Sequence, residues 1–170
     1  MYEPDYSTLR DETPFSGSAS HTYLALLAVT GIPIRDYFLD AAAGIELYRR
    51  GIPLLRDMFG PDIAPPGLHT PPVSYGHVNG LGASLQFPEG GEVHCAPVAD
   101  SLDEGLRLVR RKVDFASAGM APFYLEYRRR LSEAFDGQPC RLAYKDEGPV
   151  TTAYTLRGQA MFLDPHDSPD

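Results

Sequence analysis

Residues 144–158, with the sequence YKDEGPVTTAYTLRG, constrain the fold more than any other stretch of this chain. The apolar run Cys140–Tyr144 precedes them, and short apolar runs bounded by turn residues are typical of buried strands. Two carboxylates and a Gly-Pro pair then end the strand, because proline cannot donate to a ladder. Thr151 and Thr152 are suited to cap a helix over about 152–163. This order predicts a βα unit.

The loop after this strand is the predicted site, because ligands in parallel α/β folds bind at the carboxyl ends of strands. Asp146 and Glu147 are the candidate catalytic residues, since two neighbouring carboxylates can raise the pKa of one of them for acid–base work. The alternative is a solvated acidic turn that pairs with Lys145 or Arg157. Both interpretations are open from the sequence.

Five further residues are candidates for substrate binding. Tyr75 and His77 follow the region predicted for the first strand and can line a pocket. Gly148 lets the backbone approach a ligand beside Thr151, and Arg157 can bind a carboxylate or phosphate through two parallel hydrogen bonds. Each also has a structural alternative: a surface position for His77, a turn for Gly148, a helix cap for Thr151 and a surface salt bridge for Arg157.

Hydrophobic periodicity predicts three helices before that unit. Residues 41–59 form one, with Asp40 as its cap and Pro53 as a kink or break. Ser101-Leu-Asp-Glu104 is a capping box that opens a second, and Pro122 begins a third that a glycine ends. The residues predicted to be buried are Ile45, Tyr48, Ile52, Leu55 and Phe59 in the first helix, Leu102, Leu106, Val109 and Val113 in the second, and Tyr124, Tyr127, Leu131 and Phe135 in the third.

The remaining segments complete an α/β pattern. Residues 81–87 and 93–98 predict a hairpin, and the proline-rich residues 60–72 predict a loop that can shape a pocket wall. The expected domains are an N-terminal arm with a short helix, 1–39, and a barrel-like domain, 40–170. The fold class is the N-terminal part of a (β/α)₈ TIM-type barrel, incomplete because such a barrel needs about 250 residues and two or three strands cannot close a ring.

Composition and charge exclude several classes of function. A net charge of −8 disfavours non-specific binding to nucleic acid, which depends on neutralising phosphates with Lys and Arg. The chain has no apolar run long enough for a transmembrane helix, and its start lacks the pattern of a signal peptide. Cys95 and Cys140 alone do not make a disulfide framework. We therefore expect a cytoplasmic protein with no nucleic-acid or membrane partner.

Three stretches together resemble the uroporphyrinogen decarboxylase superfamily. They are Val73–Glu92 (VSYGHVNGLGASLQFPEGGE), Ser101–Glu104 and Glu147–Gly158 (EGPVTTAYTLRG). The resemblance covers about residues 40–165 and corresponds to the N-terminal half of such a protein. It implies a (β/α)₈ barrel in a family of cofactor-free porphyrinogen decarboxylases and zinc-dependent, cobalamin-linked methyltransferases.

Within this family the chain is more similar to the methyltransferase branch. Decarboxylases have an aspartate near the end of the first barrel strand, but no acidic residue lies between Ile63 and Gln86. Their Arg-rich phrase that holds substrate carboxylates is also absent, and Arg49-Arg50-Gly51 is a poor substitute. Ser74–His77 and Phe87–Glu92 fit the methyltransferase branch better.

For a complete methyltransferase-like protein, the resemblance implies zinc and a corrinoid carried on a partner protein. The zinc stabilises a thiolate that accepts the methyl group, and the family's zinc ligands belong to the C-terminal half. His94 and Cys95 are neighbours on a predicted strand and so point to opposite faces. We predict no metal and no cofactor within this chain, which alone would be inactive.

Two other functions are compatible with the sequence. One is a true uroporphyrinogen decarboxylase of haem biosynthesis, in which another acid replaces the missing aspartate. The other is a non-catalytic binding or assembly module that covers its open strand edges by dimerising. The expected partners are accordingly a corrinoid protein or a small-molecule substrate, together with a C-terminal half or a second copy. The sequence does not decide between an enzyme and a module.

Overall fold

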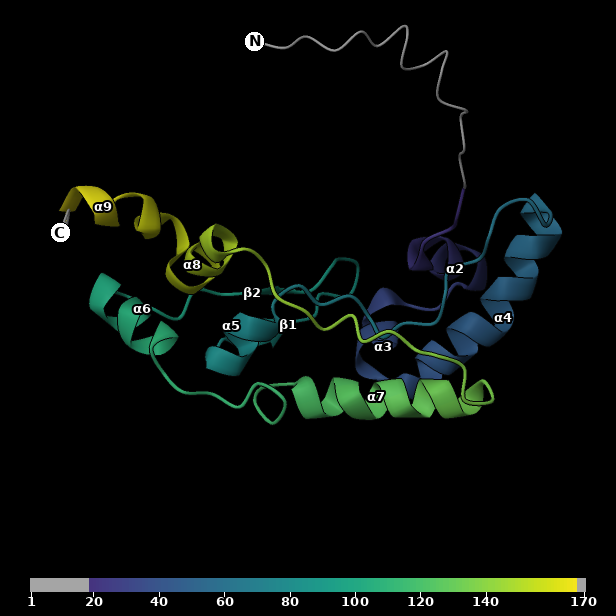
Figure 1. The fold of residues 1–170 in the computed structure, drawn as a ribbon. Helices are drawn as coiled ribbons and strands as arrows, with labels where there is room; N and C mark the ends of the chain where they lie inside the picture. Colours follow the sequence, from purple (N-terminus) through teal and green to yellow (C-terminus); the bar gives the residue numbers. More distant parts are fainter. Residues whose placement is uncertain (1–18, 168–170) are drawn as a thin grey trace, which may run out of the picture.

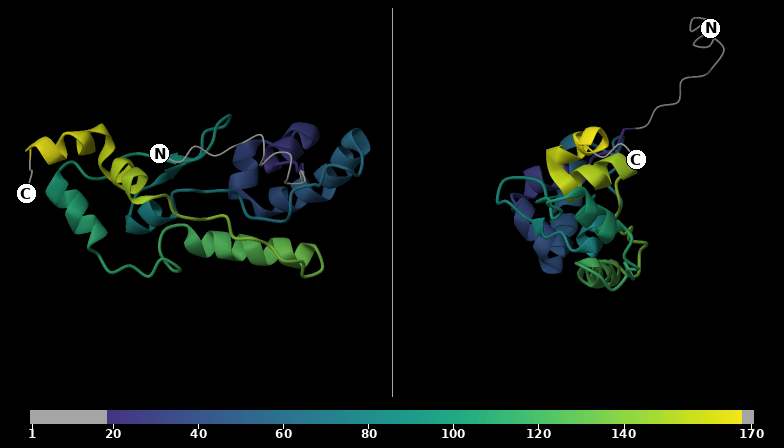
Figure 2. Two further views of the ribbon diagram at one scale, coloured as in Figure 1. Left: turned by 45° about the horizontal axis from the view of Figure 1, so that its top comes forward. Right: turned by 90° about the vertical axis from the view of Figure 1, so that its left-hand side faces the viewer.

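A computed structural model describes residues 19–167 of the chain, so the irregular arm predicted for residues 1–20 lies almost entirely outside the described part. The molecule is elongated, with α7 along one side and the other helices gathered toward its two ends (Figure 1). Viewed along its long axis it is compact (Figure 2). The elements are α2 Tyr23–Thr30, α3 Ile34–Leu39, α4 Ala41–Phe59, α5 Gly76–Leu81, β1 Leu85–Gln86, β2 His94–Cys95, α6 Leu102–Val109, α7 Ala121–Ala134, α8 Pro149–Arg157, the 3-10 helix η1 Gly158–Phe162 and α9 Asp164–Asp167.

Strands β1 and β2 form the predicted hairpin, in shorter form than expected. They pair antiparallel, with Leu85 opposite Cys95. Residues 76–81 form helix α5, which the sequence did not predict and which includes Leu81, the first residue of the predicted strand. Gly82 ends this helix with a φ of 119° that a residue with a side chain rarely adopts. Residues 19–167 are thus mixed helix and strand and do not form a closed barrel.

A second, irregular backbone pairing joins residues 68–76 to residues 141–145. The two segments run parallel, with bridges from His69 to Arg141 and from Val73 to Tyr144. The N–H of Lys145 donates to the carbonyl of Val73 at 2.9 Å. Since α5, α6 and α7 lie in the connection, the arrangement is a parallel pair with a helical crossover. The strand predicted at Cys140–Tyr144 takes part in this pairing without becoming a continuous strand.

Helix α4 packs with α2, α3 and α7 around the larger hydrophobic core. The Asp40 carboxylate accepts the N–H of Ala42 at 2.8 Å, which confirms the predicted cap. The helix continues through Pro53, so the predicted break there is wrong.

The buried face of α4 differs in part from the predicted stripe. Tyr48 and Leu55 are buried as predicted, whereas Phe59 is exposed. Two glycines, Gly44 and Gly51, occupy the centre of the buried face, because Tyr127 of α7 and Leu26 of α2 pack where their side chains would be. The periodicity prediction considered only the apolar residues of α4. It therefore missed the two glycines and predicted a face that only partly overlaps the buried one.

The capping box of α6 forms as predicted. The Ser101 hydroxyl accepts the N–H of Glu104 at 3.2 Å, and the Glu104 carboxylate accepts the N–H of Asp100 at 3.0 Å. The predicted burial of Leu102, Leu106 and Val109 is wrong, because no residue of α6 is buried and its apolar side lines an open groove.

The prediction for α7 is confirmed, and two parts of the prediction for α8 are corrected. Tyr124, Tyr127 and Leu131 are buried on α7 as predicted. The predicted capping of α8 by threonine side chains is wrong, because α8 begins earlier, at Pro149, whose fixed φ suits the first helical turn. Gly158, with a φ of 71°, then separates α8 from η1, so the helix predicted over 152–163 is two elements.

No helix of residues 19–167 has the length and apolar character needed to cross a membrane.

Candidate functional site

The carboxyl ends of the two parallel segments bring Tyr75 and Glu147 to the same edge. Cys95 of β2 packs with Tyr75 against the same small hydrophobic cluster, and Cys95, Glu147 and Glu92 of the hairpin turn all raise the pKa of Tyr75. We call Tyr75, Glu92, Cys95 and Glu147 the strand-end cluster. Glu92 also accepts a hydrogen bond from the Tyr23 hydroxyl at 3.4 Å, which ties the hairpin turn to the start of α2.

Electrostatics determine what this cluster can do. Burial raises the pKa of Tyr75, and the neighbouring Cys95, Glu147 and Glu92 raise it further. Burial also raises the pKa of the Cys95 thiol to about 11. Both groups are therefore protonated at neutral pH and can donate hydrogen bonds, while the exposed carboxylates can accept them. The cluster can bind a polar substrate, but it does not supply a thiolate nucleophile.

Asp146 faces different surroundings from Glu147. It lines a cavity of about 200 Å³ together with Phe115, Tyr144 and Lys145, and the members of the strand-end cluster do not line that cavity. The structure thus does not bring the two predicted catalytic carboxylates to one cavity.

Three of the residues predicted to bind substrate lie outside the strand-end cluster and contact other residues of the chain. The His77 ring packs edge-on against Phe115, with ring centroids 4.8 Å apart. Gly148 is the N-cap of α8, and its carbonyl accepts the N–H of Thr152 at 2.9 Å. Thr151 is exposed, and its carbonyl accepts the Thr155 hydroxyl at 2.7 Å.

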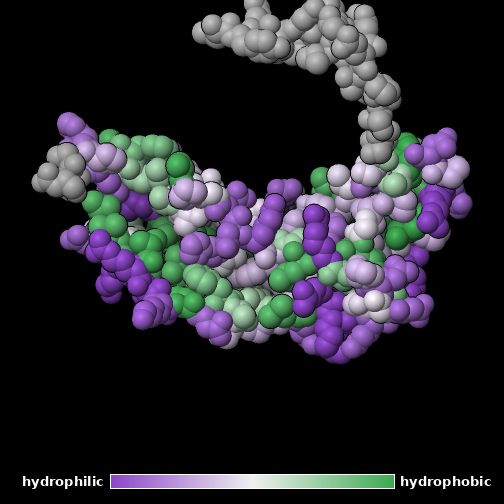
Figure 3. Space-filling view, viewed as in Figure 1, coloured by the Kyte–Doolittle hydropathy of each residue, from purple (hydrophilic) through white to green (hydrophobic). Residues whose placement is uncertain are grey.

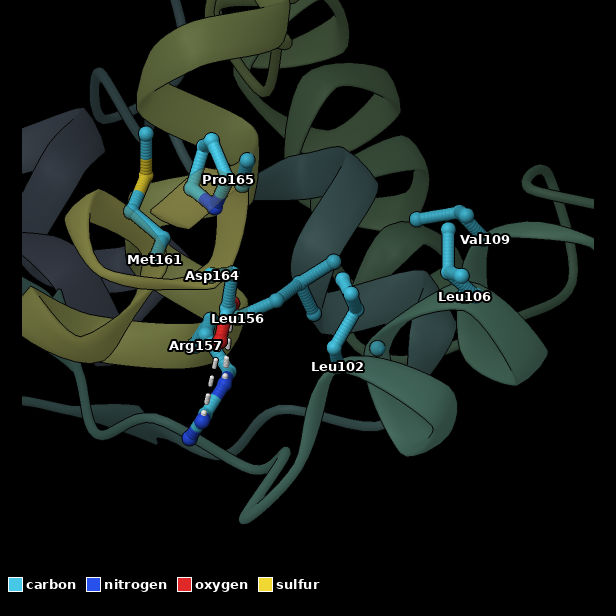
Figure 4. Close-up of a pocket in the computed structure, with 10 residues that line it drawn as sticks. Leu102, Leu106, Val109, Leu156, Arg157, Met161, Asp164 and Pro165 are labelled. Carbon is cyan, nitrogen blue, oxygen red and sulfur yellow. Dashed lines mark hydrogen bonds and ion pairs between the residues drawn. The ribbon is translucent and has the colours of Figure 1, made fainter. Parts of the chain in front are cut away.

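Arg157 is the last of the residues predicted to bind substrate. It lies beside an apolar groove of about 380 Å³ between α6 and the α8–α9 segment (Figure 4). Its guanidinium binds both oxygens of Asp164 at 3.2 Å, and these two side chains are only 20% and 14% exposed. It also donates to the carbonyls of Ala99 and Asp100 at 3.3 and 3.0 Å. All three guanidinium nitrogens are thus engaged within the chain, and Arg157 holds three segments together.

We expect Arg157→Lys to lower the free energy of unfolding by about 2 kcal/mol. Lysine cannot bind both carboxylate oxygens of Asp164 at once, and leaving one oxygen of this mostly buried carboxylate without a partner is costly. Urea unfolding of the full chain measures this change. The matched control is Arg107→Lys, whose pair with Glu104 is 73% exposed on the arginine side. That control should change stability by less than about 0.5 kcal/mol. Equal effects of the two substitutions would contradict this role for Arg157.

Sequence reasoning missed Asn79, which is 8% exposed on α5. Its side-chain oxygen accepts the N–H of Met120 and the Tyr144 hydroxyl, both at 2.7 Å, and its amide nitrogen donates to the carbonyl of Ala83 at 2.7 Å. Asn79 therefore links α5, the start of α7 and the second parallel segment behind the strand-end cluster. The one available signal was a single asparagine between apolar residues.

Residues 19–167 contain no group of three or more His, Cys, Asp or Glu side chains placed to hold a metal ion. Cys95 and Cys140 are free thiols. The described residues therefore do not form the zinc site that the resemblance implies for a complete methyltransferase-like protein.

The chain matches no protein-family model, no curated protein and no solved structure. Geometry and side-chain chemistry are therefore the basis on which a function can be assigned.

Proposed function

We propose that this chain is the substrate-binding N-terminal part of a uroporphyrinogen decarboxylase-like barrel of the methyltransferase branch. The observation that supports this most directly is the parallel pairing of residues 68–76 with residues 141–145. Parallel neighbours joined through helices are the repeating unit of a (β/α)₈ barrel, and barrel substrates bind at the carboxyl ends of the strands. The strand-end cluster lies at those ends.

In this proposal the chain binds and orients the substrate. The Tyr75 phenol donates a hydrogen bond to an oxygen of the bound substrate or corrinoid, and the Glu147 carboxylate accepts one from a donor of the same molecule. A corrinoid on a partner protein supplies the methyl group when it is bound. Because the Cys95 thiol is protonated at neutral pH, it is not the methyl acceptor, and the described residues alone bind without turnover.

Calorimetric titration of the full chain with methylcobalamin and with uroporphyrin tests the proposal. We expect methylcobalamin to bind, and we expect Tyr75→Phe to weaken binding about five- to tenfold through loss of one hydrogen bond. Tyr154→Phe is the matched control, since this phenol is 43% exposed on α8, and it should leave binding unchanged. Binding of uroporphyrin alone would favour the decarboxylase alternative. Binding of neither compound would contradict the proposal.

A second candidate, an assembly module, is favoured by exposed hydrophobic side chains on α8 and η1 and directly after η1. Val150, Phe162 and Leu163 are 65%, 64% and 61% exposed. Figure 3 shows hydrophobic residues gathered over the end of the molecule that carries α6, α8 and α9. Light scattering tests this candidate: a dimer that Phe162→Ser dissociates would favour the module, and a monomer at about 100 μM would contradict it.

A further inference from the structure

A second cavity, of about 590 Å³, lies at the opposite, amino-terminal ends of the two parallel segments. Its walls include Pro65, Pro66 and Pro72, so the proline-rich loop shapes a pocket wall as the sequence predicts. His69 and Arg141, the first bridged pair of the parallel segments, both line it. None of the described residues that line it is acidic, although Asp and Glu number 23 in a chain of net charge −8.

Three side chains that contain nitrogen line this cavity, those of His21, His69 and Arg141. The Nε2 atom of His21 is buried and has no hydrogen-bond partner among residues 19–167. His69 is only 8% exposed, and its Nδ1 lies 2.7 Å from the carbonyl of Thr70. Because a carbonyl only accepts, Nδ1 carries the proton and Nε2 is the free nitrogen of that ring. Within the described residues, the exposed guanidinium of Arg141 forms no ion pair, and it too lines the cavity.

The N-terminus of α2 adds positive potential. Its N-cap residue, Thr22, lines the cavity and makes no side-chain capping hydrogen bond, and the first turn contains no acidic residue. The N–H groups of a helix's first turn have no intrahelical partner and carry partial positive charge. Together with Arg141 and the two histidines, this end of the molecule attracts anions in an otherwise acidic protein.

We propose that this cavity binds a small organic anion, in which a carboxylate or phosphate group is attached to a flat apolar body. Arg141 binds two anionic oxygens through parallel N–H groups, and the first turn of α2 donates to the same group. The proline wall and the ring of Tyr23 contact the apolar body. The volume falls in the range of small-molecule sites, about 300–1,000 Å³. This site is separate from the strand-end cluster and does not depend on the function proposed for it.

Affinity for the anion is expected to rise as the pH falls. Burial lowers the pKa of His69 and the charge of Arg141 lowers it further, while the hydrogen bond to Thr70 acts in the opposite direction. Among residues 19–167, the other titratable groups that face this ring are Tyr23 of α2 and Tyr48 of α4, and neither is a carboxylate that could compensate. A bound anion raises the pKa of His69 above its value in the free protein. Proton uptake therefore accompanies binding, and acid strengthens it.

NMR titration of the full chain, observed through its histidine side chains, tests the site with benzoate, phenyl phosphate and inorganic phosphate. We expect benzoate or phenyl phosphate to shift His21 and His69, to bind at least about tenfold more tightly than inorganic phosphate, and to bind more tightly at about pH 5.5 than at about pH 8. The preferred organic anion identifies the ligand group as carboxylate or phosphate.

The key variant is Arg141→Gln, which should weaken binding about tenfold or more, because it removes the charged two-point contact. Its side chain is exposed, so the fold is retained, and an unchanged urea midpoint checks this. Arg110→Gln, an exposed arginine at the end of α6, is the matched control and should not change affinity. Wild-type affinity in Arg141→Gln would overturn the proposal. No histidine shift at about 10 mM organic anion, or equal binding of inorganic phosphate, would overturn it as well.

Discussion

Replacing Asn79 by leucine is expected to lower the free energy of unfolding by about 3 kcal/mol, measured by urea denaturation. Leucine has a similar volume, so the change removes hydrogen bonds with little change in packing. It leaves the N–H of Met120 and the carbonyl of Ala83 without their partner, and it takes from the Tyr144 hydroxyl the shorter of its two contacts. Buried polar groups that lose their partners carry the full cost of desolvation.

A double-mutant cycle separates this effect from general damage to the core. Tyr144→Phe removes one of the groups that Asn79 satisfies, so the loss in the double variant should be smaller than the sum of the two single losses. Gln86→Leu, an exposed amide on β1, is the matched control and should stay within about 0.5 kcal/mol of wild type. Additive losses at Asn79 and Tyr144 would show that the hydrogen bond at 2.7 Å between them contributes nothing.

Gly44→Ala is expected to lower the free energy of unfolding by about 2 kcal/mol, although alanine is normally the better helix residue by about 1 kcal/mol. An added Cβ would overlap the hydroxyl of Tyr127, and the ring atom that carries the hydroxyl lies only 2.6 Å from it. Tyr127 is 1% exposed and donates to the carbonyl of Tyr37 at 2.9 Å, so its ring cannot move without losing that bond and opening the core. The steric cost therefore exceeds the gain in helix propensity.

Gly105→Ala on α6 is the matched control and should have the opposite sign. A Cβ there would meet only the Cβ of Ala99 at 3.7 Å, an ordinary contact, so helix propensity decides and stability should rise by up to about 1 kcal/mol. Urea denaturation measures both variants. If Gly44→Ala were also stabilising, the close approach of α7 to α4 would be wrong.

Much of the local structure was predictable because neighbouring residues determine it. The Asp40 cap and the Ser101 capping box each depend on contacts within about four residues. Periodicity likewise identified the buried tyrosines of α7, because a long helix with one apolar stripe leaves little choice of face.

The candidate site was predictable only in part. The rule that ligands bind at the carboxyl ends of parallel strands led to Tyr75 and Glu147, which the fold brings to one edge. The rule could not show that Asp146 lines a cavity from which Glu147 is absent, because this difference depends on how the segment packs in the folded protein. For Arg157 the sequence offered a ligand clamp and a surface salt bridge. The structure shows a salt bridge, and its partner Asp164 is known only once the chain turns at Gly158.

The sequence by itself determined the bounds of α4, the start of α6 and the presence of the hairpin, because short-range hydrogen bonds and backbone preferences act within a few residues. Only the tertiary structure decided which groups meet across long stretches of chain. It paired residues 68–76 with 141–145, placed Asn79 between α5 and α7, and gathered His21, His69 and Arg141 around one cavity. The physical reason is that such contacts depend on the packing of whole helices, and no local preference encodes that packing.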